Sequence, residues 1–161
     1  MLRATKNGKT RMLHKPAVTE SLARHIVATQ WDEIPSQVRH QAKRSLVNFF
    51  AVTLAGCRSR PIETALRSLS EFSGGKQVAL IGREERIDAL SAAFLNAAGA
   101  NVDDFCDTHT ATVIHPTAPV AGALFSHAGL RQVSGGDLLL ALVLGNEVGS
   151  PYRACDIAQS L

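Results

Sequence analysis

The sequence predicts an all-α domain of about six helices with one short extended segment. Apolar residues recur at helical spacing over most of the chain, and the run that reads as extended is 77-QVALIG-82. Aromatic residues make up 5% of the 161 residues, whereas alanine, leucine and valine are abundant. Such small and aliphatic side chains favour closely packed helices over an aromatic-rich β-sandwich.

The start of the domain is predicted from a change in pattern. Residues 1–16 lack apolar periodicity and are rich in lysine and arginine, so we expect a flexible basic tail there and a helical domain over residues 17–161. The first helix should begin near Thr19, with Thr19 or Ser21 as its N-cap. Its apolar face comprises Leu22, Ile26 and Val27.

A second, longer helix is predicted after a loop over residues 31–37. Ser36 is the expected N-cap, and Gly56 is well placed to stop the helix. The apolar stripe of this helix comprises Val38, Ala42, Leu46, Phe49, Phe50 and Leu54. Its solvent face carries Arg39, Lys43 and Arg44.

Four further helical segments follow in the second half of the chain. The predicted elements are a helix after Pro61 that ends at 73-SGG-75, a helix within 86–105 that reaches at least Ala97, a helix from Thr117 to Leu130, and an apolar helix over 138–148 opened by 134-SGGD-137. Residues after Pro151 also have a helical pattern. The alanines of segment 86–105 indicate close packing between helices.

Charge and cysteine usage narrow the classes of function. The net charge of +3 is modest and much of it lies in the first fifteen residues, so no nucleic-acid surface is predicted. No secretory signal is visible, and 138-LLLALVLG-145 is too short to cross a membrane. The cysteines are three, widely spaced and without a CxxC pair, which favours a reducing compartment, and we expect the cytoplasm.

The stretch 103-DDFCDTHTATVIHPTAP-119 concentrates the chemistry-bearing side chains. Asp103, Asp104 and Asp107 have the spacing of a Mg²⁺-diphosphate motif, but the chain has no second acidic cluster. His109 and His115 lie six residues apart with a proline following, so they do not share a helical face as a zinc-binding HExxH pair does. No metal site is therefore predicted.

Acid/base catalysis requires fewer suitably placed residues in this stretch than a metal site does. His115 directly precedes a predicted helix start, where Thr117 can act as the N-cap and the free N–H groups favour a substrate carboxylate. Asp104, Asp107 and Thr108 lie on the preceding loop and can converge on the same point. The alternative is a polar loop whose aspartates only cap turns.

The other histidines are expected to have structural positions. His25 and His40 lie on predicted helices among charged neighbours and are expected at the surface. His127, in 121-AGALFSHAGL-130, is expected in the core or at an interface.

The stretch 96-NAAGANVDDFCDTHTATVIHPTAPVAGALFSHA-128 resembles the motif region of the MmgE/PrpD superfamily, which includes 2-methylcitrate dehydratases and cis-aconitate decarboxylases. Members carry D-F-D-D-T-H, a spacer and H-P-[ST]-A, followed by an Ala-rich helix. The resemblance extends over residues 19–153. It implies the N-terminal part of a helical domain that, in full-length relatives, is followed by further helices and a separate lid domain absent from this sequence.

The resemblance also implies roles for individual residues. Matched position by position, His115 is the acid/base group, and Asp104 and Thr108 orient it or bind substrate. Three further residues are implied as substrate-binding: Asp107, His109 and Thr117. Relatives act on small polycarboxylates without a metal or organic cofactor, usually as homodimers.

Two positions depart from the family pattern. Cys106 stands where an aspartate is usual, and Asn101 stands where a histidine is common. The first departure replaces a carboxylate with a thiol. We interpret that thiol as incidental rather than nucleophilic, because no lysine or arginine adjoins it in sequence to lower its pKa.

The expected function is that of an N-terminal fragment of a cofactor-independent lyase, most like a 2-methylcitrate dehydratase. A cis-aconitate-type decarboxylase and a polycarboxylate epimerase are alternatives of the same class. A non-catalytic helical interaction module or an inactive truncated remnant is the alternative from a different class. The expected partners are a small polycarboxylate substrate and either a second copy in a homodimer or a complementing C-terminal polypeptide.

Overall fold

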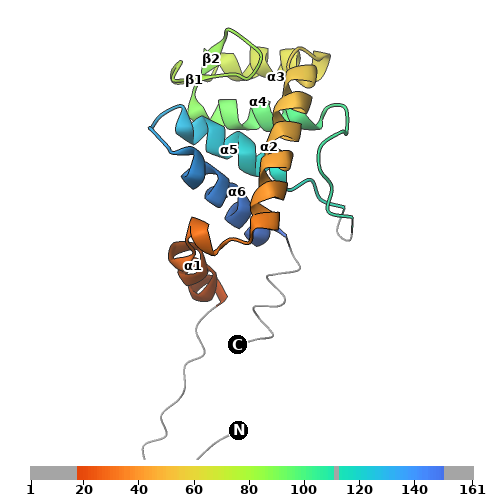
Figure 1. Cartoon of the computed structure of the whole chain (residues 1–161). Coiled ribbons are helices and arrows are strands. Elements are labelled where there is room, and N and C mark those ends of the chain that lie inside the picture. The colour runs from red at the N-terminus through yellow and green to blue at the C-terminus, as the bar shows by residue number, and fades with distance from the viewer. Residues whose placement is uncertain (1–17, 111–112, 151–161) are drawn as a thin grey trace, which may run out of the picture.

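A computed structural model describes residues 18–110 and 113–150 of the chain, and Figure 1 shows their arrangement. The elements, in chain order, are α1 (Val18–Ala28), the short 3-10 helix η1 (Trp31–Glu33), α2 (Ser36–Gly56), α3 (Arg60–Ser70), β1 (Val78–Ala79), β2 (Arg86–Ile87), α4 (Ala89–Asn101), α5 (Thr117–Ala128) and α6 (Gly135–Gly149). The predicted all-α class, with about six helices and one short extended segment, is confirmed. The predicted tail over residues 1–16 and the helical pattern after Pro151 lie outside the described residues.

The long helix α2 is the spine of the domain and lies across α4, α5 and α6 (Figure 1). Helix α3 and the two-stranded sheet cover one side of α4, and α1 lies at the opposite end of the molecule. Strands β1 and β2 are antiparallel, with Val78 opposite Ile87. This arrangement leaves the loop between α4 and α5, which carries the predicted site, along one side of α2.

Close approach between α2 and α4 explains one of the small residues. A Cβ atom built on Gly56 would lie 2.1 Å from the carbonyl oxygen of Gly99, so the two backbones meet where no side chain fits. Helix α5 approaches α4 in a similar way, because a Cβ on Gly122 would lie 2.7 Å from the carbonyl oxygen of Ala93. The close packing predicted from the Ala-rich segment is therefore confirmed.

The core divides into two clusters on either side of α4. The first joins α3, the sheet and α4, and comprises Ile62, Leu66, Val78, Leu80, Ile87, Ala92 and Leu95. The second joins α2, α4, α5 and α6, and comprises Phe49, Ala100, Ala118, Ala121 and Leu142. In the second cluster the rings of Phe49 and Phe125 stack at 5.9 Å, and Phe50 meets Phe125 edge-on at 4.6 Å. Such aromatic contacts add to the stabilisation from apolar burial.

The beginning of the helix predicted within residues 86–105 was wrong. Arg86 and Ile87 form strand β2, and helix α4 begins only after Asp88, whose side chain accepts hydrogen bonds from the amides of Leu90 and Ser91 at 3.1 and 3.0 Å. The sequence predicts one extended run over residues 77–82, whereas the chain turns at Gly82, with a φ of +74°, and returns as β2.

Two predicted helix caps were also wrong. Pro35 occupies the N-cap position of α2, Ser36 is the first helical residue, and no side chain caps this end. Pro116 occupies the N-cap position of α5, and Thr117 is the first helical residue, with its hydroxyl engaged elsewhere. In both cases the proline before the expected cap fixes its own φ near helical values and takes the cap position, so the helix starts one residue earlier than expected. Helix α6, by contrast, has a side-chain cap, since the Ser134 hydroxyl accepts from the amide of Asp137 at 3.0 Å.

Some positions differ in exposure from the expectation. Val38 and Leu54 belong to the predicted apolar stripe of α2 but are 41% and 53% exposed. His127, expected in the core or at an interface, is exposed on α5. His40 is exposed as predicted, and His25 is half-buried because its Nε2 lies 3.2 Å from the Glu147 carboxylate on α6.

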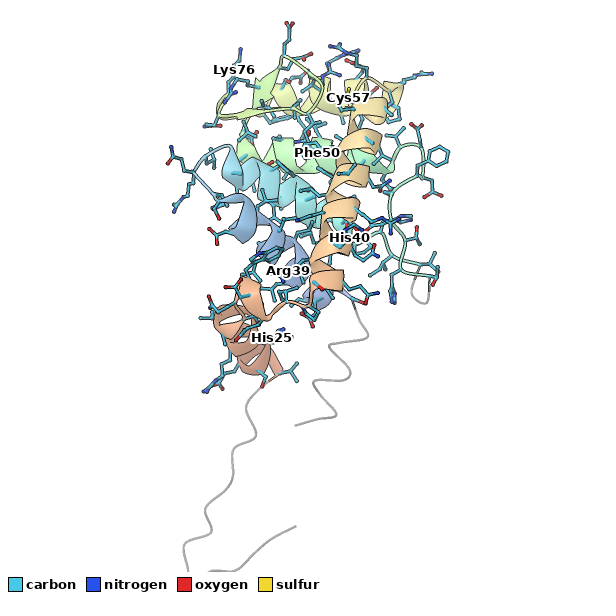
Figure 2. All side chains as sticks on the ribbon, viewed as in Figure 1. His25, Arg39, His40, Phe50, Cys57 and Lys76 are labelled. Atoms are coloured by element: carbon cyan, nitrogen blue, oxygen red, sulfur yellow. The ribbon has the colours of Figure 1, made fainter. Side chains whose placement is uncertain are left out.

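The N-terminal helix is joined to the body of the domain by few side chains. Figure 2 shows His25 on α1 and Arg39 near the start of α2. The Arg39 guanidinium lies 5.6 Å from the centre of the Trp31 ring in η1, which is the geometry of a cation–π contact. Together with the His25–Glu147 contact, this pair fixes the lower end of the molecule as drawn.

Candidate active site

The loop between α4 and α5 folds back on itself and brings the motif residues together. It is held to α2 by Asn48, whose side-chain amide donates to the carbonyl of Phe105 at 3.1 Å. A tight turn follows, in which the amide of His109 donates to the carbonyl of Ile114 at 2.8 Å and the two residues pair as an isolated bridge. This turn returns the chain, so that His115 lies beside residues 104–108.

His115 is the centre of a polar cluster in which the three residues implied as catalytic meet. Its Nε2 lies 3.5 Å from a carboxylate oxygen of Asp104, and its Nδ1 lies 3.3 Å from the hydroxyl of Thr108. The sulfur of Cys106 lies 3.1 Å from the same Nδ1 and 3.0 Å from the side-chain oxygen of Asn101. We refer to these five residues as the His115 cluster.

The cluster is open to solvent on the Asp104 side. The Asp104 side chain is 79% exposed, whereas that of His115 is 27% exposed. Because a carboxylate only accepts hydrogen bonds, a neutral His115 facing Asp104 carries its proton on Nε2. Nδ1 then holds a lone pair that faces the thiol and the hydroxyl. An imidazole in this position can give and take a proton, which is what general acid/base chemistry requires.

Asp107 and Thr117 form a second cluster. The Thr117 hydroxyl donates to Asp107 at 2.5 Å and accepts from the side-chain amide of Asn146 on α6 at 2.9 Å. Thr117 is only 1% exposed, so its side chain binds the loop to α6 rather than facing solvent. The structure therefore places Thr117, which was expected to bind substrate, away from the exposed face of the His115 cluster. Asp107, also expected to bind substrate, is half-buried between Thr117 and the surface.

Burial and charge act together on the Cys106 thiol. Burial raises its pKa, and the negative charges of Asp107 and Asp104 raise it further. The residue is 8% exposed and is a free cysteine. A thiol with a raised pKa stays protonated at neutral pH and is a poor nucleophile, which agrees with the interpretation that it is not a reactive cysteine.

A shallow hollow of about 320 Å³ adjoins the cluster on its α2 side. Its lining comprises Gln41, Arg44, Ser45, Asn48, Phe105, Cys106 and Asp107. The sequence predicted Arg44 only as a solvent-facing residue of α2. In the structure its guanidinium is hydrogen-bonded to the Gln41 side chain at 3.0 Å, and Arg44 is the one positively charged residue in the lining of the hollow.

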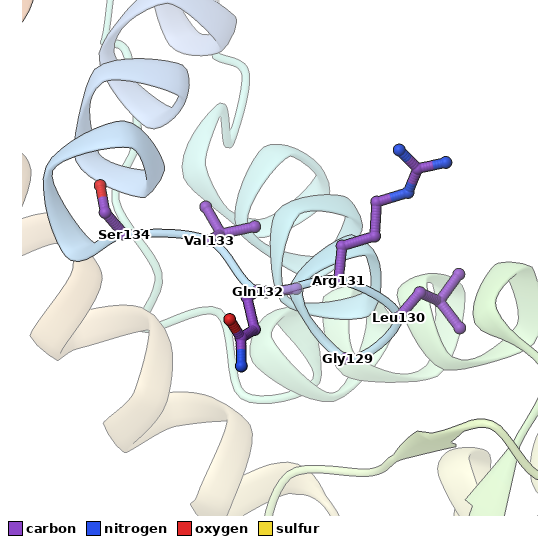
Figure 3. Close-up of a pocket in the computed structure, with 7 residues that line it drawn as sticks. Gly129, Leu130, Arg131, Gln132, Val133 and Ser134 are labelled. Carbon is purple, nitrogen blue, oxygen red and sulfur yellow. The ribbon is translucent and has the colours of Figure 1, made fainter.

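Larger hollows lie elsewhere, and two of them border α6 or the turn before it. One, of about 740 Å³, follows the turn between α5 and α6, and Figure 3 shows Gly129 to Ser134 around it. The other, of about 540 Å³, is an apolar groove lined from α1 by Ile26 and from α6 by residues that include Leu140, Leu144 and Val148. Neither is lined by a residue of the His115 cluster, so size alone does not locate the chemistry in this chain.

The sequence analysis did not predict the polar contacts that Asn48, Asn101 and Asn146 make around the site. The sequence identifies Asn101 only as a departure from the family pattern. In the structure its side-chain oxygen accepts a hydrogen bond from Cys106, the other residue that departs from the pattern. Asn146 had a signal that could have been used, since it is an amide within the otherwise apolar run of α6. A buried amide in an apolar helix normally has a hydrogen-bonding partner.

The described part of the chain contains no preformed metal site. Among residues 18–110 and 113–150, no group of three or more His, Cys, Asp or Glu side chains is arranged to hold a metal ion. Within the same residues no helix is both long and apolar enough to span a lipid bilayer.

The fold and the cluster together define a helical domain that carries an imidazole–carboxylate–hydroxyl cluster on the loop between α4 and α5. The sequence model of the MmgE/PrpD N-terminal domain matches residues 20–155. The chain belongs to the MmgE/PrpD family, as the motif resemblance indicated.

Known relatives have lyase names and are much longer. Over 139 residues the chain is 29% identical to the cis-aconitate decarboxylase-like protein oryM of Aspergillus oryzae, which covers 82% of this chain and 29% of that protein. It is 25% identical over 140 residues to the cis-aconitate decarboxylase of Aspergillus terreus, covering 84% of this chain and 29% of that protein. The chain thus spans less than a third of the length of these curated relatives.

Proposed function

We propose that the chain supplies the acid/base half of a lyase that acts on small polycarboxylates without a cofactor. The observation that carries the proposal is the His115 cluster, in which one imidazole meets a carboxylate at Nε2 and a hydroxyl at Nδ1. Family membership and the names of the relatives support the lyase class. Asp104 orients the imidazole and stabilises its protonated form, and Thr108 holds Nδ1.

Decarboxylation of a cis-aconitate-like acid is the first reaction to test, because the similar proteins bear that name. In such a reaction the bond to one carboxyl carbon breaks, carbon dioxide leaves, and the electron pair stays on the remaining carbon. A proton must then reach that carbon. A protonated His115 is suited to deliver it, and Arg44 at the adjoining hollow is suited to attract the remaining carboxylates.

Dehydration of a 2-methylcitrate-like acid is the second candidate, favoured by the motif around His115. There a base removes a proton from carbon, the bond to the hydroxyl oxygen breaks, and an acid protonates the leaving hydroxide. His115 can serve in either half of this step. Both reactions require the substrate to be enclosed, and we propose that a C-terminal polypeptide of the family, or a second copy of the chain, completes the site.

The test is an activity assay with matched variants. The purified chain, alone and mixed with the remaining C-terminal part of the Aspergillus terreus enzyme, is given cis-aconitate and 2-methylcitrate, and release of carbon dioxide or formation of the unsaturated acid is followed. We expect His115→Gln to lower turnover by about 10²–10⁴-fold, the typical contribution of a general acid or base. His127→Gln, on the exposed face of α5, should leave turnover unchanged.

Asp104 calls for a particular substitution in this assay. Asparagine tolerates a φ of +58°, whereas alanine would be strained at this angle. Asp104→Asn therefore removes the charge and preserves the backbone conformation. We expect Asp104→Asn to lower turnover, though less than His115→Gln does. Absence of turnover of both substrates in both settings would contradict the proposed function.

A further inference from the structure

Nδ1 of His115 faces two hydrogen-bond donors, and each donor has a second acceptor within reach. The Cys106 sulfur is 3.1 Å from Nδ1 and 3.0 Å from the side-chain oxygen of Asn101. The Thr108 hydroxyl is 3.3 Å from Nδ1 and 3.5 Å from the carbonyl oxygen of Cys106. The two acceptors of the thiol lie at nearly equal distances, 3.0 and 3.1 Å, whereas the second acceptor of the Thr108 hydroxyl is farther away, at 3.5 Å. The thiol is therefore the donor that can turn most readily from one acceptor to the other.

The thiol is a donor and has one hydrogen to give. Burial raises the pKa of Cys106, and Asp107 and Asp104 raise it further, so the group is S–H at neutral pH. Asn101 presents a carbonyl oxygen, which only accepts. The single S–H bond therefore points either to Asn101 or to His115, and rotation about the Cβ–S bond interchanges the two directions.

These two directions match the two states of an acid/base histidine. When His115 is neutral with its proton on Nε2 toward Asp104, Nδ1 accepts, and the S–H of Cys106 can point to it. When His115 is protonated on both nitrogens, Nδ1 donates, and the S–H must turn away. Asn101 accepts it at 3.0 Å, and the sulfur lone pair is left facing Nδ1. The Thr108 hydroxyl can keep its hydrogen on the carbonyl oxygen of Cys106, at 3.5 Å, in both states. Neither state therefore leaves a donor facing a donor, and no heavy atom has to move.

We propose that Cys106 and Asn101 are positioning residues of the His115 cluster, which let Nδ1 change from acceptor to donor by rotation of one S–H bond. The inference rests on the proposed acid/base role of His115, but the hydrogen bonding itself is measurable in the chain without any turnover. It gives a shared purpose to the two positions at which the chain departs from its family pattern, since they contact each other.

The experiment is ¹⁵N nuclear magnetic resonance of the histidine rings in the full chain, at a pH where the imidazoles are neutral. The Nδ1 resonance of His115 is assigned by its loss in His115→Gln. We expect Cys106→Ala to shift this resonance toward that of a nitrogen with fewer hydrogen bonds. Asn101→Ala removes the competing acceptor, so it should shift the resonance in the opposite direction. Cys106→Ser, which keeps a donor, should preserve the hydrogen-bonded position.

The matched control is Cys57→Ala. Cys57 is also a buried free cysteine, but its thiol donates to the carbonyl of Leu54 at 3.1 Å and contacts no residue of the His115 cluster, so the His115 resonance should not move. Backbone amide spectra establish that each variant is folded. If Cys106→Ala does not fold, Cys106→Ser and Asn101→Ala decide the matter. Equal shifts in the same direction for Cys106→Ala and Asn101→Ala, or no shift in Asn101→Ala, would overturn the proposal.

Discussion

Among the described residues of the site loop, two hold a left-handed backbone without being glycine. Asp104 has a φ of +58°, and Val113 has a φ of +56°. Aspartate tolerates this region because its short polar side chain bonds locally, whereas a β-branched residue is strongly disfavoured there. The loop that returns the chain to His115 is therefore strained at Val113, next to the residues that it has to position.

Relief of this strain should increase the free energy of unfolding by a measurable amount. We expect Val113→Gly to raise the free energy of unfolding by about 0.5–1 kcal/mol, the relief of the left-handed strain less the entropy cost of glycine. Urea unfolding followed by helical circular dichroism gives the value. Val133→Gly is the control, since Val133 lies in the turn before α6 without a positive φ and should gain nothing. Equal effects at both positions would mean that the loop is not strained.

The sequence motif predicted only some of the residues that lie together in the site. The motif identified His115, Asp104 and Thr108, and the structure brings all three together. It did not indicate that Thr117 is buried in a different cluster, because that depends on a partner, Asn146, twenty-nine residues later in the chain. Pairings between side chains from separate helices depend on packing, which sequence periodicity does not specify.

At the scale of single elements, the crossing of α2 and α4 is asymmetric. A Cβ on Gly56 would lie 2.1 Å from a backbone oxygen of Gly99, whereas a Cβ on Gly99 would meet nothing closer than 3.8 Å. The two glycines face each other, yet only one of them is required by space. The requirement falls on the last residue of α2, where the sequence predicted a glycine as a stop signal.

Substitution of the two glycines should therefore have opposite effects. We expect Gly56→Ala to lower the free energy of unfolding by about 1–3 kcal/mol, because backbone atoms must move apart. Gly99→Ala should be neutral or stabilising by up to about 1 kcal/mol, since alanine is the better helix former. Thermal unfolding of the two variants beside the unsubstituted chain tests this. Equal destabilisation by both would show that the helices cross differently.

The N-cap of α4 should make stability depend on acid pH. The pKa of Asp88 is lowered to about 2, mainly because the backbone amide of Ser91 donates to its carboxylate and the side chain of Ser91 adds to this. A lowered pKa in the folded state means that the contribution is present above the ordinary value of 3.8 and is lost as the pH falls toward 2.

Variants at Asp88 separate the charge from the cap. Asp88→Asn keeps a capping oxygen but does not titrate, so its unfolding midpoint in urea should depend less on pH than that of the unsubstituted chain over this acid range. Asp88→Ala should be less stable than both at neutral pH, because two amides of α4 lose their acceptor. An identical pH dependence for the asparagine variant would contradict this account.

The boundary errors share a physical cause. Prolines 35 and 116 shifted two helix starts by one residue, and Asp88 displaced the start of α4 to the far side of a hairpin. The helical interiors were predicted well, because their apolar spacing persists over many residues. The ends of the helices depend on one or two capping hydrogen bonds each, and several neighbouring residues in the sequence are chemically able to form such a bond.

At the scale of the whole molecule, stability depends on the second core cluster, where four helices meet. Phe49 is 1% exposed and stacks on Phe125, whereas Phe72, after α3, is 85% exposed. We expect Phe49→Ala to lower the free energy of unfolding by about 3–5 kcal/mol, since it removes buried area and leaves a cavity. Phe72→Ala should change it by less than about 0.5 kcal/mol. Urea unfolding of both variants is the measurement, and a small effect at Phe49 would contradict the arrangement of this core.

The fold class of the molecule was predictable because it follows from composition and periodicity. The path of the loop from α4 to α5 was not, because His115 reaches Asp104 only through a tight turn closed by backbone bonds of His109. No local pattern in the sequence indicates such a turn. The site is therefore predictable as a set of residues and not as a geometry.

The outlying position of α1 has a consequence for the order in which the chain opens. None of its described residues is buried, and its contact from His25 to Glu147 joins positions 122 residues apart. A helix held by so little apolar area separates from the rest at a low free energy, well before the body unfolds. Its amides should exchange with deuterium early, while those of α4 exchange last. The chain thus has a first step of unfolding that leaves the His115 cluster intact.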